Sequence, residues 1–278
     1  GGEPVLDGNV LNLWRGFSVT PLIGAWPLMQ RHIKEVLARR NPVAAMYIFH
    51  WAAWAIQHPD KRAEVALVLR GGKGSGKGTF GNAMCELFGS HGQHIYSPKH
   101  LLGSFNAHLR NCQLLFADEA FWAGDRQGES TLKGLITEPT IQIEQKGIDA
   151  VQWRNRLHVI MAANADWVVP ASKGERRYAV FDVSDGHVGD FEYFRALQDE
   201  MKNGGLGAML WDLQHLELGA WHPRHIPSTE ALEDQKALSL AGPFAWWETV
   251  LQEGNLPGIK ETNLSVTLRS SAMLQLSR

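Results

Sequence analysis

Residues 65–79 read VALVLRGGKGSGKGT, and they are the strongest indication of the fold. Its first five residues form a short, continuous apolar run, which is typical of a buried parallel strand. The glycine-rich segment behind it matches the pattern GxxxxGK, and residues 80–88 then read as a helix. A strand, a glycine loop and a helix in this order are the context that a phosphate-binding loop requires.

The glycine loop has the chemistry of an anion site. Glycines let backbone N–H groups turn inward around a phosphate, the helix adds its positive N-terminus, and Lys77 is expected to reach the β- and γ-phosphates of ATP. The residues expected to bind the nucleotide are Gly71, Gly72, Lys73, Gly74, Ser75, Gly76, Lys77, Gly78, Thr79 and Phe80. The hydroxyl residue that normally follows the lysine and helps to hold Mg²⁺ is replaced by Gly78. Either Thr79 shifts slightly to do so, or a water molecule takes that place.

Three further apolar runs follow the loop, at residues 113–117, 157–163 and 178–183. With the first run they predict an α/β domain with a mainly parallel central sheet, of the P-loop NTPase (AAA+-like) class. We place this core at residues 63–185.

The parts on either side of the core are predicted to be helical, in an N-terminal region (1–62, mostly helical from residue 10) and a C-terminal region (186–278). The predicted helices cover residues 30–40, 43–56, 190–218 and 229–252. The apolar stretch 43–56 is shorter than the ~20 residues that span a bilayer, so no membrane association is expected.

Asp118 and Glu119 stand at the end of the second apolar run, about 40 residues after Lys77. The carboxyl ends of parallel strands face the ligand crevice. Asp118 is therefore expected to hold Mg²⁺ together with Thr79, and Glu119 to activate the attacking water. Acidic residues that merely decorate a helix N-terminus are the alternative. The preceding phosphate loop favours the catalytic interpretation.

Asn164 ends the third apolar run, at the same sheet edge as Asp118. Its amide could sense the γ-phosphate, or it could be an ordinary turn asparagine, and local sequence favours neither. Arg176 and Arg177 precede the last strand, and one of them is a candidate arginine finger for a neighbouring subunit. A solvated basic turn is the usual explanation for such a pair.

Residues 140–144 and 148–153 alternate between apolar and polar side chains around Gln145-Lys146-Gly147. This pattern predicts a β-hairpin with Lys146 at or near its tip. In a ring of copies, Lys146 and Gly147 would meet the phosphate backbone of a nucleic acid. A solvated surface hairpin is the plainer alternative.

The composition limits the class of protein. A formal net charge of -2 and a pI of about 6.7 exclude a surface that is coated with nucleic acid throughout. Two cysteines without metal-type spacing predict a reducing compartment and no disulfide framework. The chain begins with Gly1-Gly2 and carries no signal peptide pattern, so we expect a piece of a longer protein.

Taken together, these motifs resemble those of the superfamily-3 helicases, in particular the helicase part of bacteriophage and prophage primase-helicases. More distantly, the chain is similar to the poxvirus, papillomavirus and polyomavirus replicative helicases. The segments that carry the resemblance are NLWRGF (12–17), QHPDK (57–61), the glycine loop, FADEA (116–120), TLKGLIT (131–137), IEQKG (143–147), AANAD (162–166), GERRYAVFDV (174–183) and residues 227–240.

The resemblance implies an ATP-dependent DNA helicase with an AAA+-related core, assembled as a hexameric ring with ATP and Mg²⁺ between subunits. By carry-over Asn164 would be the sensor, Lys146 would grip single-stranded DNA, and Arg177, with Arg176 second, would be the finger in trans. Gly147 stands where the animal-virus helicases carry a histidine. A primase module would lie upstream, and the protein would act in the bacterial host cytoplasm.

Two other functions stay open on sequence grounds. Nucleoside monophosphate kinases also carry Gly-Lys-Gly-Thr, but usually near the start of the chain. An AAA+ module that binds nucleotide and DNA without unwinding would share the same loop.

Overall fold

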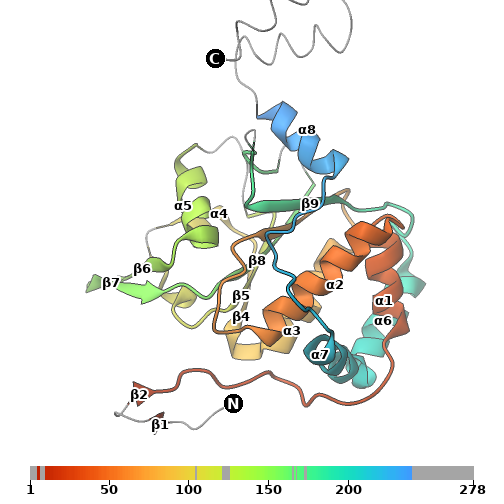
Figure 1. Ribbon diagram of the computed structural model, residues 1–278, viewed down its shortest axis with the longest axis horizontal. Helices are drawn as coiled ribbons and strands as arrows, with labels where there is room; N and C mark the ends of the chain where they lie inside the picture. Colours follow the sequence, from red (N-terminus) through yellow and green to blue (C-terminus); the bar gives the residue numbers. More distant parts are fainter. Residues whose placement is uncertain are drawn as a thin grey trace, which may run out of the picture. The chain divides into compact units, whose positions relative to one another are not determined.

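The four predicted apolar runs all form strands of one sheet. In the computed structural model these strands are β3 Ala66–Arg70, β5 Leu114–Asp118, β8 His158–Ala163 and β9 Tyr178–Asp182. With the strand β4, Gly92–Ile95, the order across the sheet is β4-β5-β8-β3-β9, and each neighbouring pair is parallel. Strands β4, β5, β8 and β9 are labelled in Figure 1. The fold is therefore mixed α/β with a parallel central sheet, and helices flank it as predicted.

The structure describes residues 5–6, 10–103, 105–120, 126–164, 166, 168–171 and 174–239. All of them belong to one compact unit, residues 1–239, whereas a second unit, residues 240–278, lies outside the described part. The division of the chain at residues 62 and 185 stays a prediction.

The sequence pattern misses the strand β4, Gly92–Ile95, which forms the edge of the sheet next to β5. It contains only four residues, and Gln93 and His94 in its middle are polar. An edge strand pairs on one side alone and is partly exposed, so it lacks the continuous apolar run that marks a central parallel strand.

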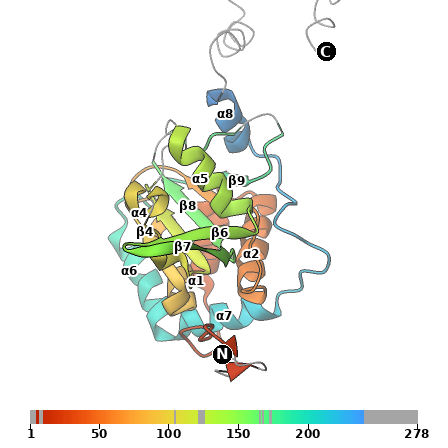
Figure 2. The same ribbon diagram turned by 90° about the vertical axis from the view of Figure 1, so that its left-hand side faces the viewer.

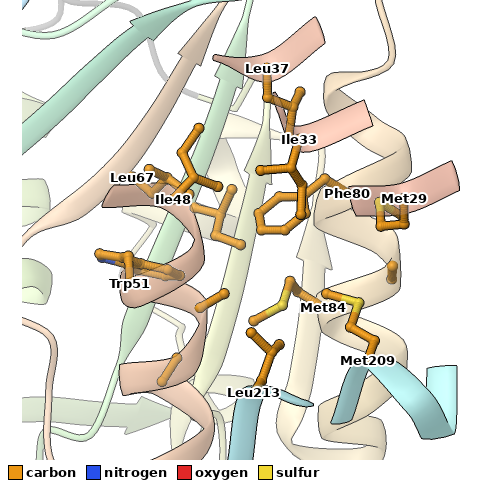
Figure 3. Close-up of a cluster of buried hydrophobic side chains, with 14 of the residues drawn as sticks. Met29, Ile33, Leu37, Ile48, Trp51, Leu67, Phe80, Met84, Met209 and Leu213 are labelled. Atoms are coloured by element: carbon orange, nitrogen blue, oxygen red, sulfur yellow. The ribbon is translucent and has the colours of Figure 1, made fainter. Parts of the chain in front are cut away.

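The strands bury both of their faces, in two separate cores. Along β3, Leu67 and Leu69 point into the first core, whereas Ala66 and Val68 point into the second. The first core lies between β3 and a set of helices, as the labelled side chains show (Figure 3). These helices are α1 Pro27–Arg31, η1 His32–Leu37, α2 Pro42–Gln57, α3 Lys77–Phe88, α6 Phe191–Glu200 and α7 Leu206–His215.

The second core is covered by shorter elements on the opposite face of the sheet (Figure 2). These are α4 Pro98–Leu102, α5 Arg126–Thr137, the strands β6 Thr140–Gln145 and β7 Ile148–Arg154, and α8 Glu230–Leu238. Single turns of 3-10 helix, η2 Gly89–His91 and η3 Ala107–Leu109, join neighbouring elements. A separate pair of two-residue strands, β1 Val5–Leu6 and β2 Val10–Leu11, begins the chain.

The apolar stretch at residues 43–56 forms helix α2, as predicted. Asn41 caps it by accepting hydrogen bonds from the N–H groups of Val43 and Ala44, and Pro42 supplies the first helical residue. The ring of Trp51 is fully buried, and its Nε1 donates to the carbonyl of Val65 at 3.0 Å, which ties the helix to the start of β3. Among the described residues no helix is both long and apolar enough to cross a bilayer.

The N-terminal region is less helical than predicted. Residues 12–26 are extended or irregular, because Gly16, Pro21 and Gly24 break any helical run. The helix predicted over residues 30–40 begins earlier, at Pro27, and ends at Leu37 after one stretch of π-helix, η1.

The C-terminal helices are broken where the sequence pattern suggested one long segment. The predicted helix 190–218 is α6, then the π-helical segment η4 Met201–Gly205, and then α7. Gly204 interrupts the run with φ +104°. The predicted helix 229–252 is seen as α8, and residues 240–252 lie outside the described residues.

The predicted β-hairpin is confirmed. Strands β6 and β7 pair antiparallel and are joined by the two residues Lys146 and Gly147. Gly147 adopts φ +78°, which two-residue hairpin turns require and which glycine adopts without strain. The hairpin lies on the side of the sheet that carries the second core (Figure 2). Lys146 is exposed in the turn between its two strands.

Candidate functional site

The glycine loop connects the end of β3 to the start of α3 and turns tightly around its own backbone. Gly74 and Gly76 adopt φ +75° and φ +96°, and Gly76 is the N-cap residue directly before α3. A Cβ atom on Gly76 would lie 2.4 Å from Cε1 of His32. Position 76 therefore requires glycine, because its φ is positive and because a side chain there would collide with His32.

Lys77 is folded back over this loop. Its Nζ donates to the carbonyls of Gly71 at 2.6 Å and Gly72 at 2.7 Å, and to Oδ1 of Asn164 at 3.0 Å. The hydroxyl of Ser75 lies 3.3 Å away. Burial lowers the pKa of Lys77, and the charges of nearby carboxylates, Asp118 first, oppose that shift.

Asn164 joins the lysine to the acidic pair. Its Oδ1 accepts from Lys77, and its Nδ2 donates to Oε1 of Glu119. An ammonium group can only donate and a carboxylate can only accept, so this orientation of the amide is the one that satisfies both neighbours. Three residues that are far apart in the sequence thus form one row at the carboxyl end of the sheet.

Asp118 ends β5, and its side chain is about one-third exposed. Its Oδ2 lies 3.6 Å from Nε2 of His94, which comes from the edge strand β4 and stacks on Phe116. Glu119 adopts φ +54°, a strained conformation for a residue with a side chain. Such strain at a polar cleft is frequent in functional sites.

These residues surround a cavity of about 360 Å³. Its walls are residues 73–79 of the loop together with Asn82, Asp118, Glu119, Asn164 and Phe194. The side chain of Phe80, predicted to bind nucleotide, is instead buried in the first core (Figure 3). Gly71 and Gly72 contribute the carbonyls that hold Lys77 rather than walls of this cavity.

The donor set at the cavity fits Mg²⁺ bound together with phosphates. Mg²⁺ needs one or two protein carboxylates when phosphate and water supply the other ligands, and Asp118 and Glu119 both line the cavity. Within the described residues no group of three or more histidine, cysteine or acidic side chains could hold a metal by itself. A Cβ on Gly78 would lie 3.9 Å from Oδ2 of Asp118, so the helix start faces this carboxylate with space between them.

Two wall residues and two neighbours were not predicted from the sequence. Asn82 is one helical turn beyond Gly78, on the same face of α3, so its spacing could have indicated it. Phe194 comes from α6, and no local pattern connects it with the loop. Asp185 and His94 approach the loop and Asp118 respectively, again from separate elements.

A buried histidine supports the loop from behind. His32 has no exposed surface; its Nε2 lies 3.1 Å from the carbonyl of Gly76, and its Nδ1 lies 3.1 Å from the hydroxyl of Tyr193. A carbonyl only accepts, so Nε2 carries the proton and Tyr193 donates to Nδ1. Burial lowers the pKa of His32 to about 4, so this neutral tautomer persists at pH 7.

The two candidate arginine fingers are not part of this cavity in the same chain. Arg177 precedes β9, at the amino end of the sheet, whereas the glycine loop lies at the carboxyl end. The Nη1 of Arg177 lies 3.2 Å from the buried carboxylate of Glu175, and Arg176 is exposed. Lys146 and Gly147, at the hairpin tip, also lie outside the cavity.

Comparison with known proteins gives similarities over parts of the chain. A model described as a family of unknown function (DUF5906) matches residues 69–177. A DNA primase-polymerase of Nitratiruptor phage NrS-1 is 26% identical over 178 residues, which are 61% of this chain and 24% of that protein.

Solved structures of the C-terminal region of NrS-1 share the fold. One apo structure aligns with a TM-score of 0.72 at 19% identity and covers 85% of this chain and 58% of that one. The A form apo structure gives 0.70 at 18% identity, with coverages of 83% and 56%. The chain thus spans about a quarter of the curated relative and just over half of these solved chains.

Proposed function

We propose that the protein is an ATP-dependent replicative DNA helicase that hydrolyses ATP, translocates on single-stranded DNA and unwinds duplex. The similarity to a phage protein named as a DNA primase-polymerase supports a role in DNA replication. The glycine loop, the acidic pair and the hairpin support the finer assignment to a superfamily-3, AAA+-related P-loop NTPase from a phage primase-helicase.

One observation carries this proposal. Lys77, Asn164 and Glu119 form a hydrogen-bonded row beside the glycine loop, within a single polar cavity. In a triphosphate site, Lys77 would neutralise the β- and γ-phosphates, Asn164 would sense the γ-phosphate, and Glu119 would activate the water.

Nucleotide binding would rearrange this row. The phosphates would replace the carbonyls of Gly71 and Gly72 as partners of Lys77, which would release the Oδ1 of Asn164. Glu119 would then accept a proton from a water molecule as the water oxygen attacks the γ-phosphorus. The bond between that phosphorus and the β,γ-bridging oxygen would break, to give ADP and phosphate.

Mg²⁺ would neutralise the charge on the phosphate oxygens when it is bound. Asp118 would hold it, and Thr79, or a water in front of Gly78, would take the place of the usual hydroxyl ligand. Asn82 would lie near the same position, since its Nδ2 is 4.0 Å from where a Cβ of Gly78 would be.

The ring and the DNA contact belong to the same proposal. Arg176 and Arg177 would face the nucleotide of a neighbouring subunit in a homo-hexamer, and Arg176 has the more exposed side chain. Lys146 and Gly147, at the exposed hairpin tip, would contact the phosphates of single-stranded DNA in the channel.

ATP hydrolysis measured with and without single-stranded DNA tests the proposal. We expect DNA to stimulate hydrolysis, Lys146→Ala to remove the stimulation, and Glu119→Gln to lower the rate by at least about 100-fold. Glu233→Gln, an equal change at an exposed site on α8, serves as the control and should keep the rate. Full hydrolysis by Glu119→Gln would refute the assignment of the base.

Mixing two inactive variants tests the ring. A site that combines Glu119 from one subunit with Arg177 from the next, or with the second candidate Arg176, is restored when Glu119→Gln subunits assemble with Arg177→Ala or Arg176→Ala subunits. We expect the mixture to hydrolyse ATP faster than either variant alone. Transfer of phosphate to nucleoside monophosphates, without DNA stimulation, would instead identify a kinase. ATP binding and DNA binding without turnover would identify a non-unwinding AAA+ module.

A further inference from the structure

A second cavity, of about 480 Å³, lies at the amino end of the sheet. Gln113 precedes β5 and Arg156 precedes β8, and both line it. Strand β8 has six residues and is thus about 20 Å long, so this amino-end cavity is remote from the glycine loop at the other end of the strands.

Three arginines, Arg110, Arg154 and Arg156, line the amino-end cavity. Among the described residues none of the three forms an ion pair or a side-chain hydrogen bond with a carboxylate. Asp60 is the one acidic lining residue, so the lining carries an excess of positive charge. Burial first, and then the charge of Arg154, lower the pKa of Arg156. Like charges held together in this way favour an anionic ligand.

Aromatic rings stand beside these charges. The guanidinium of Arg110 lies over the ring of Trp153, 4.4 Å from its centre. Trp14 also lines the cavity and packs on His91, with ring centres 4.7 Å apart. Both indole rings are half-buried, so each is held in place while part of it stays open to solvent. Indole rings and guanidinium planes are the surfaces on which nucleic-acid bases stack.

Two polar atoms of the lining residues lack a partner within the part of the chain that the structure describes. They are Oε1 of Gln113 and Nε1 of Trp153, an acceptor and a donor. Gln113 is nine-tenths buried, and its backbone is fixed by a hydrogen bond from its N–H to the carbonyl of His91. Unpaired buried groups are costly, and two such groups belong to residues that line this cavity.

The amino-end cavity is joined to the hairpin. Trp153 and Arg154 end β7, and the other end of β7 leads to the turn at Lys146. A chain of phosphates that contacts the tip of the hairpin can therefore follow β7, which is about 23 Å long and is labelled in Figure 2, to the cavity that Trp153 and Arg154 line.

We propose that the amino-end cavity binds a nucleotide unit of single-stranded DNA, with the phosphate held by Arg110, Arg154 and Arg156 and the base stacked at Trp153. This goes beyond the proposed function, because it adds a nucleic-acid contact remote from both the triphosphate cavity and the hairpin tip. It requires neither ATP hydrolysis nor unwinding. A single strand is favoured over duplex since its bases are free to stack.

Binding of a fluorescein-labelled dT20 oligonucleotide, measured by fluorescence anisotropy without nucleotide, tests the proposal. We expect the double variant Arg154→Gln/Arg156→Gln to bind at least tenfold more weakly. Its plot of log affinity against log salt should be shallower by about 1.4, the loss of two phosphate contacts on a single strand. The control Arg195→Gln/Lys202→Gln removes two exposed positive charges from α6 and η4 and should bind almost as the wild type does.

Trp153→Phe and Arg110→Gln test the stacking and the third arginine separately. Each is expected to weaken dT20 binding about threefold or more, while thermal melting verifies that each variant is folded. Equal binding by the cavity variants and the control would overturn the proposal. So would preferential binding of pyrophosphate that these changes abolish, which would indicate a small-anion site.

Two further outcomes separate this proposal from others. A change of oligomeric state in light scattering, with unaltered dT20 affinity, would make the cavity a subunit interface and overturn the proposal. If the helicase proposal fails, ATP hydrolysis is absent. The dT20 binding measurement contains no nucleotide, so its result does not depend on ATP hydrolysis.

Discussion

The two ends of the central sheet hold positive charge in opposite ways. At the carboxyl end, Lys77 is surrounded by acceptors from the glycine loop and by Asn164, which in turn reaches Glu119. At the amino end, Arg154 and Arg156 lie together without a paired carboxylate among the described residues. At the carboxyl end the positive charge already has hydrogen-bond partners within the protein, whereas at the amino end the positive charges have no paired carboxylate among the described residues. The proposed triphosphate would therefore replace contacts at the carboxyl end, and the proposed single strand would supply them at the amino end.

Both ends are nevertheless fixed by a buried neutral histidine. His32 supports the glycine loop through the carbonyl of Gly76, and His158, at the start of β8, lies 3.0 Å from the carbonyl of Gln113 through its Nδ1. Each ring is fully enclosed, and burial lowers the pKa of each to about 4. A buried neutral histidine thus supports the backbone at both ends, although the charges there are arranged differently.

The largest expected effect is that of Gly76→Ala. The new methyl group would lie 2.4 Å from His32 and 2.8 Å from Phe194, at a residue with φ +96°. The loop must then move, and we expect ATP hydrolysis to fall by at least about 100-fold, since a displacement of 1 Å is sufficient for such a loss. Binding of dT20 at the other end should stay within twofold of wild type, which sharpens the contrast between the two ends.

Gly189→Ala is the matched control for that change. Gly189 has φ +81°, but nothing lies within 4 Å of its Cβ position. Gly189→Ala therefore introduces backbone strain without a steric clash. We expect a loss of about 1 kcal/mol in stability and little change in hydrolysis. Equal losses of hydrolysis in both variants would show that the contact with His32 is unimportant.

The second prediction concerns pH. In the unfolded chain both histidines titrate near 6.5, whereas in the folded protein they titrate near 4. The unfolded state therefore binds more protons between these values, and stability is fully present above pH 6.5 and falls as the pH drops toward 4. Each histidine contributes at most about 3 kcal/mol to this loss.

Urea unfolding at pH 7 and at pH 4.5 measures this loss. Wild type should lose stability on acidification, and His32→Gln and His158→Gln should each reduce the loss while lowering stability at pH 7. His215→Gln, at an exposed histidine on α7, should leave the pH dependence unaltered. A wild-type stability that is independent of pH in this range would contradict the burial of both rings as neutral groups.

The smallest expected effect is that of Gly78→Ser. The space toward Asp118 accommodates the side chain, and serine is slightly better than glycine within a helix, by about 0.5 kcal/mol. We expect a stability equal to or above wild type and a change of less than about threefold in the Mg²⁺ concentration that supports hydrolysis. Hydrolysis lowered more than tenfold would show that Gly78 itself is required, for example by close approach of a phosphate.

The central strands could be predicted because each is a continuous apolar run that is buried on both faces. Residues 65–69, 113–117, 157–163 and 178–183 all match observed strands within one or two residues. Strand β4 could not, because an edge strand with polar residues lacks that signal. The interruption between α6 and α7 depends on Gly204, and the helical pattern of residues 190–218 does not reveal it.

The candidate site was predictable where its residues stand at strand ends or in the glycine motif, as Lys77, Asp118 and Asn164 do. Phe194, Asp185 and His94 could not be predicted, since only the folding of separate elements brings them to the loop. The aromatic-basic stretch Trp153-Arg154-Asn155-Arg156 contained a usable signal for the amino-end cavity. That stretch alone does not predict a cavity, because Arg110 and Gln113, which complete the lining, are distant in the sequence.

The folded-back position of Lys77 has a consequence for which molecules the protein accepts. Its three ammonium protons already have uncharged oxygens as partners at 2.6 to 3.0 Å. An adenosine molecule offers nothing better than these carbonyls and would leave the lysine where it is. A chain of phosphates, with several negative charges, gains far more from the ammonium than a neutral oxygen does. In the triphosphate site proposed above, the position of Lys77 would therefore favour nucleotides over nucleosides.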